Sequence, residues 1–210
     1  MKKVVAVQLP APYCGIGCSF CRTANEHGGD VSAVRRALSE QLADCEEVYL
    51  TSVGETGNCA EFQDIVQMLQ ERGIPVSVLC ATAQSVVAGL KRVEISYEED
   101  EPTAFTAPLA IAKARKLGVP VVLSVVDKGN KAINPQALTE RFNVSGVLIR
   151  ALQAEGHSRS CHGHSSFWVS DSAELGAFPV GAYRELASIG VSAVCIDHLG
   201  RQVQYLGAAA

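Results

Sequence analysis

The chain has 210 residues and a mass of 22.2 kDa, the size of one medium domain. Hydrophobic residues make up 48% of it and charged residues 19%, which excludes a disordered or collagen-like chain. The formal net charge is −4 and no long basic run occurs, so we expect no nucleic-acid partner. No apolar stretch approaches the ~20 residues that span a bilayer, and we expect no membrane partner.

The amino-terminal residues begin like a signal peptide, but Gln8 and Pro10 interrupt the apolar run before a hydrophobic region forms. Without such a peptide we expect a cytoplasmic protein. The chain has eight cysteines. In a reducing compartment cysteines are more often metal-binding or catalytic than disulfide-bonded.

Short apolar runs alternate with amphipathic segments along the first 150 residues. Asp30 is the expected cap of the first helix, Asn58 is that of the second, and Asn134 followed by Pro135 starts the last. In chain order the expected elements are a strand at 3–7, a helix from 30 to 42, a strand at 48–51, a helix from 58 to 73, a strand at 75–79, a short helix at 85–90, a strand at 93–97, a helix at 106–117, a strand at 121–126, a helix at 134–141 and a strand at 144–150.

This alternation predicts a parallel sheet built from right-handed βαβ units. Six strands and five intervening helices are expected, whereas a complete eight-unit barrel takes ~250 residues. We therefore expect residues 1–150 to form an open, partial (β/α)6 barrel. A doubly wound sheet is the alternative, because periodicity does not separate the two architectures.

Residues 151–210 depart from the pattern and form the expected carboxyl-terminal extension, packed on the same domain. Its expected elements are a long loop at 151–179, a helix at 182–189 and a hairpin of strands at 191–196 and 202–206. The loop contains the run from Cys161 to His164. This run is interpreted as a substrate-facing polar loop, with a metal site or a solvated loop as alternatives.

The strongest motif is C-x3-C-x2-C, formed by Cys14, Cys18 and Cys21 directly after the first expected strand. Two glycines lie inside it, where a tight wrap needs permissive backbone. Thiolates are the ligands of iron–sulfur clusters, and three of them would leave one iron of a cubane open for a substrate or cofactor. The alternatives are a zinc site with a fourth ligand such as His27, or three unrelated buried cysteines.

With this spacing, and with the aromatic Phe20 before the last cysteine, the sequence resembles the radical S-adenosylmethionine (radical SAM) superfamily over about residues 3–150. The resemblance implies that Cys14, Cys18 and Cys21 hold a 4Fe–4S cluster whose open iron binds S-adenosylmethionine. It implies reductive cleavage of that cofactor to methionine and a 5′-deoxyadenosyl radical, which takes hydrogen from an unidentified small-molecule substrate. It further implies a six-unit partial barrel and an external electron donor, a flavodoxin or a ferredoxin.

The resemblance also assigns cofactor contacts. Gly54 and Glu55 follow the second expected strand, where the superfamily often has a Gly-Gly-Glu segment that binds the amino group of the cofactor. Here Val53 replaces one glycine. Further contacts are expected near the carboxyl ends of the later strands and beside the last cysteine. They are Phe20, Ser96 or Glu98, Ser124 and Leu148.

Cys161 and Cys195 are the expected hydrogen-atom donors to a substrate radical, with a buried thiol as the alternative for each. Cys45 and Cys80 are expected in the core. Only Cys161 and Cys195 lie beyond residue 150, which is too few for a second cubane, so we expect one cluster only. The acidic run at 98–101 is interpreted as a solvated face.

The leading hypothesis is a radical SAM enzyme of unknown reaction subclass. A glycyl-radical-enzyme activating enzyme, which shares the cysteine spacing and the size, is the second hypothesis. A non-catalytic zinc or iron–sulfur binding protein is the third. Gly54 and Glu55 discriminate against the third, because a structural metal site does not require them.

Overall fold

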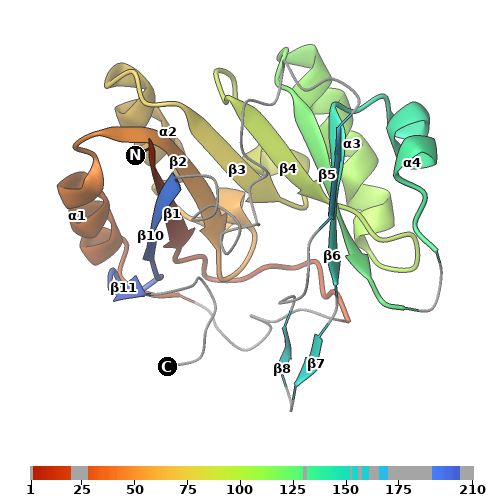
Figure 1. Cartoon of the computed structure of the whole chain (residues 1–210). Helices are drawn as coiled ribbons and strands as arrows, with labels where there is room; N and C mark the ends of the chain where they lie inside the picture. The colour runs from red at the N-terminus through yellow and green to blue at the C-terminus, as the bar shows by residue number, and fades with distance from the viewer. Residues whose placement is uncertain are drawn as a thin grey trace.

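A mainly parallel β-sheet with helices along one face forms the body of the molecule in the computed structural model (Figure 1). The structure describes residues 2–19, 28–129, 132–151, 153–155, 158–160, 166–169 and 191–203. No helix among these residues is long and apolar enough to cross a membrane. The elements in chain order are β1 (Lys2–Leu9), α1 (Val31–Gln41), β2 (Cys45–Ser52), the 3-10 turn η1 (Thr56–Asn58), α2 (Phe62–Glu71), β3 (Val76–Cys80), the 3-10 turn η2 (Ala83–Ser85), β4 (Arg92–Ser96), α3 (Thr103–Lys116), β5 (Val121–Asp127), α4 (Pro135–Phe142), β6 (Gly146–Ala151), β7 (Gln153–Glu155), β8 (Ser158–Ser160), β9 (Ser166–Val169), β10 (Val191–Ile196) and β11 (Gln202–Val203).

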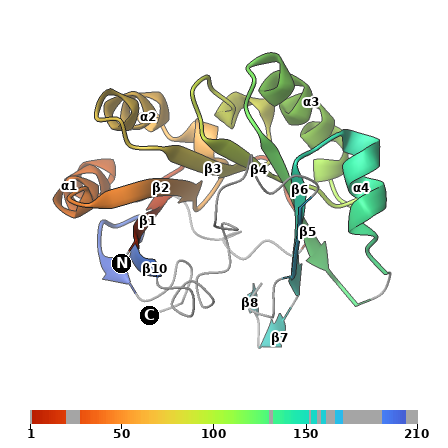
Figure 2. The same ribbon diagram turned by 45° about the horizontal axis from the view of Figure 1, so that its top comes forward.

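The order of the strands decides between the two predicted architectures. Strands β1 to β6 are neighbours in chain order and all run parallel. Figure 2 shows α1 to α4 along the outer side of the curved sheet. A doubly wound sheet would reverse its strand order and carry helices on both faces. The predicted partial (β/α)6 barrel is therefore confirmed, and it is open, because the described sheet ends at β11 and β9.

Strands from the carboxyl-terminal extension join both edges of this sheet. β10 pairs in parallel with β1, and β11 returns antiparallel to β10, which confirms the predicted hairpin. The prediction of an uninterrupted loop at 151–179 is wrong in its described parts, because β7 and β8 form a hairpin and β9 pairs with β6. The run of Phe167, Trp168 and Val169 suits such an edge strand, since aromatic and β-branched residues favour strands. The predicted helix at 182–189 lies outside the described residues.

Side-chain caps start two of the helices as predicted. Asp30 Oδ1 accepts a hydrogen bond from the backbone N–H of Ala33 at 2.9 Å, and Asn134 Oδ1 accepts one from Ala137 at 3.0 Å. These contacts satisfy amides that have no partner inside the helix. The predicted cap of α2 by Asn58 is wrong: α2 begins after Glu61, without a side-chain cap, and Asn58 belongs to η1.

The predicted helix at 85–90 is also wrong. The chain from β3 to β4 contains only the single turn η2, with non-helical residues at 81–82 and 86–91. Val86 is buried in the core, and Gly89 has a φ of +75°, a left-handed conformation that ends helical geometry. Two consecutive valines further disfavour a helix, because β-branched side chains lose rotamer freedom there.

Alternate strand residues face opposite sides of the sheet, and the two sides differ in chemistry. The side that faces the helices holds the main hydrophobic core, in which Phe62 of α2 is one of the largest buried side chains. The concave side carries a small apolar cluster of Ala6, Tyr49 and Cys195. The remaining buried residues of the concave side are mostly polar or charged, which makes it the side where a functional site is expected.

Candidate functional site

The segment that carries the first two cysteines of the motif, residues 11–19, is called the cysteine segment here. It follows β1 and runs along the edge of the sheet at which the strand arrows end (Figure 1). The N–H of Gly28 donates to the carbonyl of Ala11 at 2.8 Å, so the chain returns to the point where the segment begins. The carboxyl ends of parallel strands are the usual position of ligand sites in α/β barrels.

Cys14 and Cys18 are both half-buried. Between them Gly15 and Gly17 have φ values of +77° and +71°. Such left-handed backbone is readily adopted only by glycine, so the two glycines permit the tight turns of the chain between Cys14 and Cys18. Two other predicted site residues lie outside the described residues: Phe20 and Cys21.

One anchor holds the cysteine segment against the end of β2. A Cβ atom on Gly54 would lie 2.6 Å from the carbonyl oxygen of Tyr13, so only glycine allows this close approach. Asn58 Nδ2 donates to the carbonyls of Tyr13 at 3.0 Å and Cys14 at 3.4 Å. Gly54 thus leaves room for the backbone of Tyr13. Asn58 positions the first cysteine, although sequence reasoning assigned it to a helix cap.

A second anchor holds the other end of the cysteine segment. The N–H of Ser19 donates to Glu101 Oε2 at 2.9 Å, and the Ser19 hydroxyl donates to Glu101 Oε1. Lys128 Nζ donates to the same carboxylate at 3.0 Å and to Asp100 at 2.9 Å. The loop after β4 and the residue after β5 together fix the chain beside Cys18.

The electrostatics of this anchor explain why a carboxylate is used. Burial alone would raise the pKa of Glu101, but the hydrogen bonds from Ser19 and Lys128 outweigh it and hold the pKa below its usual value. Glu101 is therefore charged and tightly bound. The interpretation of residues 98–101 as a solvated face is wrong for Glu98 and Glu101, which are both buried.

Glu55 has a different environment from the one that a free cofactor ligand would have. Its side chain is 3% exposed. The carboxylate accepts hydrogen bonds from the N–H of Ala81 at 2.9 Å, the N–H of Thr82 at 3.2 Å, the Thr82 hydroxyl at 2.8 Å and the Ser85 hydroxyl. Through these four hydrogen bonds the Glu55 carboxylate holds the loop after β3 in place. Its predicted contact with the cofactor stays a prediction, and the backbone of Gly54 is the part of this motif beside the cysteine segment.

Three predicted cofactor contacts lie side by side on adjacent strands. Ser96 of β4 pairs with Ser124 of β5, which pairs with Leu148 of β6. By strand alternation they share the concave side with Glu94 and Arg150. Ser96 is half-buried, whereas Ser124 and Leu148 are buried, so Ser96 is the most accessible of the three.

A buried ionic network fills the concave side below this row. Arg150 of β6 forms an ion pair with Glu94 of β4, and the hydroxyl of Tyr49 lies 3.4 Å from Glu94 Oε2. Deeper in the sheet Arg92 pairs with Glu47 at 2.7 Å. Buried charges need such partners, and these ion pairs line the inside of the barrel. Sequence reasoning did not connect Arg150 with Glu94, because the two residues are 56 positions apart.

The structure describes one of the two predicted hydrogen-atom donors. Cys161 lies outside the described residues. Cys195 is 2% exposed on the concave side, in the cluster with Ala6 and Tyr49, and its role as a donor stays a prediction.

The other described thiols behave as packing groups. Burial raises the pKa of Cys59, and it raises that of Cys80 well above the usual value, so both remain protonated. Burial also raises the pKa of the half-buried Cys45. In the part of the chain that the structure describes, no group of three or more His, Cys, Asp or Glu side chains could hold a metal. The third cysteine of the motif is outside that part.

Comparison with known proteins gives structural matches only. No protein-family model and no curated protein sequence matches the chain. Streptococcus suis SuiB bound to S-adenosylmethionine aligns over 92% of this chain and 50% of its own, with a TM-score of 0.57 and 10% identity. TYW1 with a lysine-pyruvate adduct aligns over 69% of this chain and 64% of its own, with a TM-score of 0.50 and 9% identity.

A third structure, anSMEcpe with bound AdoMet and the Cp18Cys peptide, aligns over 75% of this chain and 54% of its own, with a TM-score of 0.50 and 11% identity. The chain thus spans between 50% and 64% of the length of these three proteins. All three are radical SAM enzymes. At this level of identity the similarity concerns the fold, and the chain has the partial-barrel fold of radical SAM enzymes.

Proposed function

We propose that this protein is a radical SAM enzyme. In this proposal Cys14, Cys18 and Cys21 hold a 4Fe–4S cluster, S-adenosylmethionine binds beside it, and the substrate is a small molecule. When bound, the cluster supplies the electron that cleaves the cofactor to methionine and a 5′-deoxyadenosyl radical, which takes hydrogen from the substrate. The electron comes from an external flavodoxin or ferredoxin.

The described residues fit such a group. Thiolates are the ligands that iron–sulfur clusters take, and Cys14 and Cys18 lie on backbone that wraps through two left-handed glycines. The segment is anchored on one side by Asn58 and on the other by Glu101. Anchored ligands on short segments are what a metal site needs, because their geometry must not depend on flexible chain.

The other residues of the site would orient the cofactor. We assign Ser96 and Ser124 to its polar ribose and Leu148 to its adenine, since they form one row across β4 to β6 on the concave side, with Ser96 at the carboxyl end of β4. The ammonium group is assigned to the backbone at Gly54, beside Tyr13. Glu55 then acts mainly by holding the loop after β3. Cys195 is assigned as a hydrogen-atom donor within the same concave side.

The observation that carries the proposal is the position of the C-x3-C-x2-C motif, directly after β1 of a six-unit partial barrel. It is tested by reconstituting the full chain with iron and sulfide without oxygen, then adding dithionite and S-adenosylmethionine. Wild-type protein is expected to form 5′-deoxyadenosine, measured by liquid chromatography.

Cys18→Ala is expected to lose this product. Cys59→Ala is the matched control, because Cys59 is a buried core thiol outside the C-x3-C-x2-C motif, and this variant is expected to keep the activity. A wild-type protein that binds one zinc and no iron would support the non-catalytic alternative. Reconstituted wild-type protein that forms no 5′-deoxyadenosine would contradict the proposal.

A further inference from the structure

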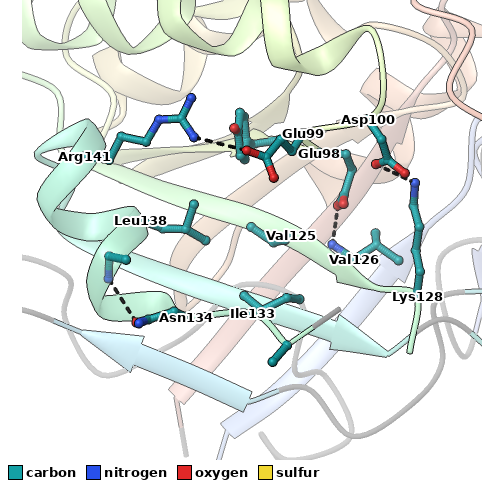
Figure 3. A pocket seen from close by; sticks show the side chains of 13 residues that line it. Glu98, Glu99, Asp100, Val125, Val126, Lys128, Ile133, Asn134, Leu138 and Arg141 are labelled. Carbon is teal, nitrogen blue, oxygen red and sulfur yellow. Dashed lines mark hydrogen bonds and ion pairs between the residues drawn. The ribbon is translucent and has the colours of Figure 1, made fainter. Parts of the chain in front are cut away.

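A cavity lies outside the site described above. It has a volume of about 380 Å³ and lies between the ends of β4 and β5 and helix α4 (Figure 3). Apolar side chains that include Tyr97, Val125, Ile133 and Leu138 form much of its wall. Its volume is in the range of small-molecule pockets, which are mostly apolar with a few placed polar groups.

This cavity opens toward the helix side of the sheet. Tyr97 and Val125 belong to the main core between sheet and helices, whereas Ser96 and Ser124 precede them by one position and face the concave side. The cavity is therefore distinct from the row of residues that we assign to the cofactor. Lys128 links it to the cysteine segment, because its ammonium group binds both Asp100 at the cavity and Glu101 at Ser19.

The charges at the rim are already paired with one another. Lys128 Nζ lies 2.9 Å from Asp100 Oδ1, and Arg141 Nη1 lies 3.6 Å from Glu99 Oε1. Arg141 also stands over the ring of Tyr97, 6.0 Å from its centroid. The lining thus holds three acidic side chains, with Glu98, against two basic ones. An anionic ligand would meet a wall of net negative charge.

Glu98 is the carboxyl group inside the cavity. It is 5% exposed and lies between the two rim ion pairs in Figure 3, beside Val126. One oxygen, Oε1, accepts a hydrogen bond from the N–H of Val126. Among the described residues no hydrogen-bond donor contacts Oε2, and Glu98 is one of the residues that line the cavity. A buried carboxyl with an available oxygen selects for a donor or a cation.

The raised pKa of Glu98 agrees with a site for a positively charged ligand. Burial raises the pKa of Glu98 to about 7, against the lowering effects of the Val126 N–H and of Lys128, while Asp100 and Glu101 raise it further. A ligand that carries a positive charge would stabilise the ionised form. Arg141 of α4 faces Glu99, and Lys128 faces Asp100 and Glu101.

We propose that this cavity binds a small organic amine, whose apolar part lies against Val125 and Leu138 and whose ammonium group pairs with the carboxylate of Glu98. The site is separate from the proposed cofactor site, and it does not depend on the cluster. A neutral molecule of the same shape would fill the apolar space without the ion pair, so the amine and its alcohol analogue separate the two contributions.

The test compares 2-phenylethylamine with 2-phenylethanol on the full chain by isothermal titration calorimetry at pH 6 and pH 8. A carboxyl that titrates near pH 7 is about one-tenth ionised at pH 6 and about nine-tenths at pH 8, so the amine is expected to bind ~10-fold more tightly at pH 8. The affinity of the alcohol is expected to stay the same. Glu98→Gln is expected to abolish the pH effect for the amine, and the matched rim variant Glu99→Gln is expected to keep it.

Circular dichroism checks that Glu98→Gln is folded. If it is not, Ala137→Phe provides the second test, because this α4 residue lines the cavity and a phenyl group there would fill it. That variant is expected to lose both ligands. The proposal is overturned if wild-type protein does not prefer the amine at pH 8, if Glu98→Gln binds it as wild type does, or if Ala137→Phe leaves binding unchanged. Displacement of the amine by S-adenosylhomocysteine would also overturn it, since the two sites would then be one.

Discussion

The contact between Ser19 and Glu101 is the most informative place to perturb the site, because it fixes the cysteine segment without involving a cysteine. In Glu101→Gln the side chain keeps its shape but has one acceptor oxygen instead of two. The N–H and the hydroxyl of Ser19, which donate to different oxygens, would then compete for one acceptor. Lys128 would also lose a charged partner, at 3.0 Å in the wild type.

The size of the effect follows from the chemistry of the lost contact. The side chains of Glu101 and Lys128 are 7% and 16% exposed, so water compensates little. A hydrogen bond to a charged group contributes roughly 2 kcal/mol, which corresponds to a ~30-fold change in a local opening equilibrium. We therefore expect the amide of Ser19 to exchange its hydrogen ~30-fold faster in Glu101→Gln, measured by NMR or mass spectrometry on the chain without iron.

The matched control is Glu99→Gln, whose side chain is 59% exposed and pairs with Arg141 at 3.6 Å. It is expected to change the exchange of Ser19 by less than ~2-fold, because exposed ion pairs contribute little. The amide of Leu123, in the centre of β5, serves as the internal reference for global unfolding. An unchanged rate at Ser19 in Glu101→Gln, or an equal increase at Ser19 and Leu123, would refute the reasoning.

Three further predictions concern the site, the core and pH. Gly54→Ala places a Cβ atom 2.6 Å from the Tyr13 carbonyl, so we expect it to displace the cysteine segment and to lower iron uptake on reconstitution. Unchanged iron content would contradict that placement. Phe62→Ala removes a ring that is 2% exposed and is expected to cost about 3–5 kcal/mol of unfolding free energy in urea titrations. A loss below ~1 kcal/mol would mean that α2 does not pack as described. Because the pKa of Glu98 is raised to about 7 in the folded protein, the folded state binds more protons than the unfolded state between about pH 4.5 and 7, and stability falls across that window as pH rises. The contribution is at most about 3 kcal/mol, and Glu98→Gln is expected to flatten this part of the stability profile, whereas an identical profile would contradict the assignment.

Local sequence signals predicted much of the fold. The alternation of apolar runs gave the six parallel strands, and the caps at Asp30 and Asn134 form as expected because a cap depends only on the next three residues. The pairing of β10 with β1 was not predicted, since it joins residues almost the whole chain apart. Periodicity carries no information on such long-range neighbours.

The site illustrates the same limit. The cysteine spacing was visible in the sequence because it is local. Asn58 was misassigned since an asparagine before a helix has the same local pattern whether it caps the helix or binds a distant carbonyl. Glu101 was placed on a solvated face because its partner Ser19 is 82 positions away. The chemistry of these residues could be read from the sequence, but their partners could not.

The central claim is that three thiols leave one iron of a cluster open for S-adenosylmethionine. The most direct test is the electron paramagnetic resonance spectrum of the anaerobically reconstituted, dithionite-reduced full chain, recorded before and after the cofactor is added. An open iron that takes the amino and carboxylate groups of the cofactor must change the spectrum, and we expect this change in wild type and in Cys59→Ala. A cluster signal that is identical with and without S-adenosylmethionine would contradict the account.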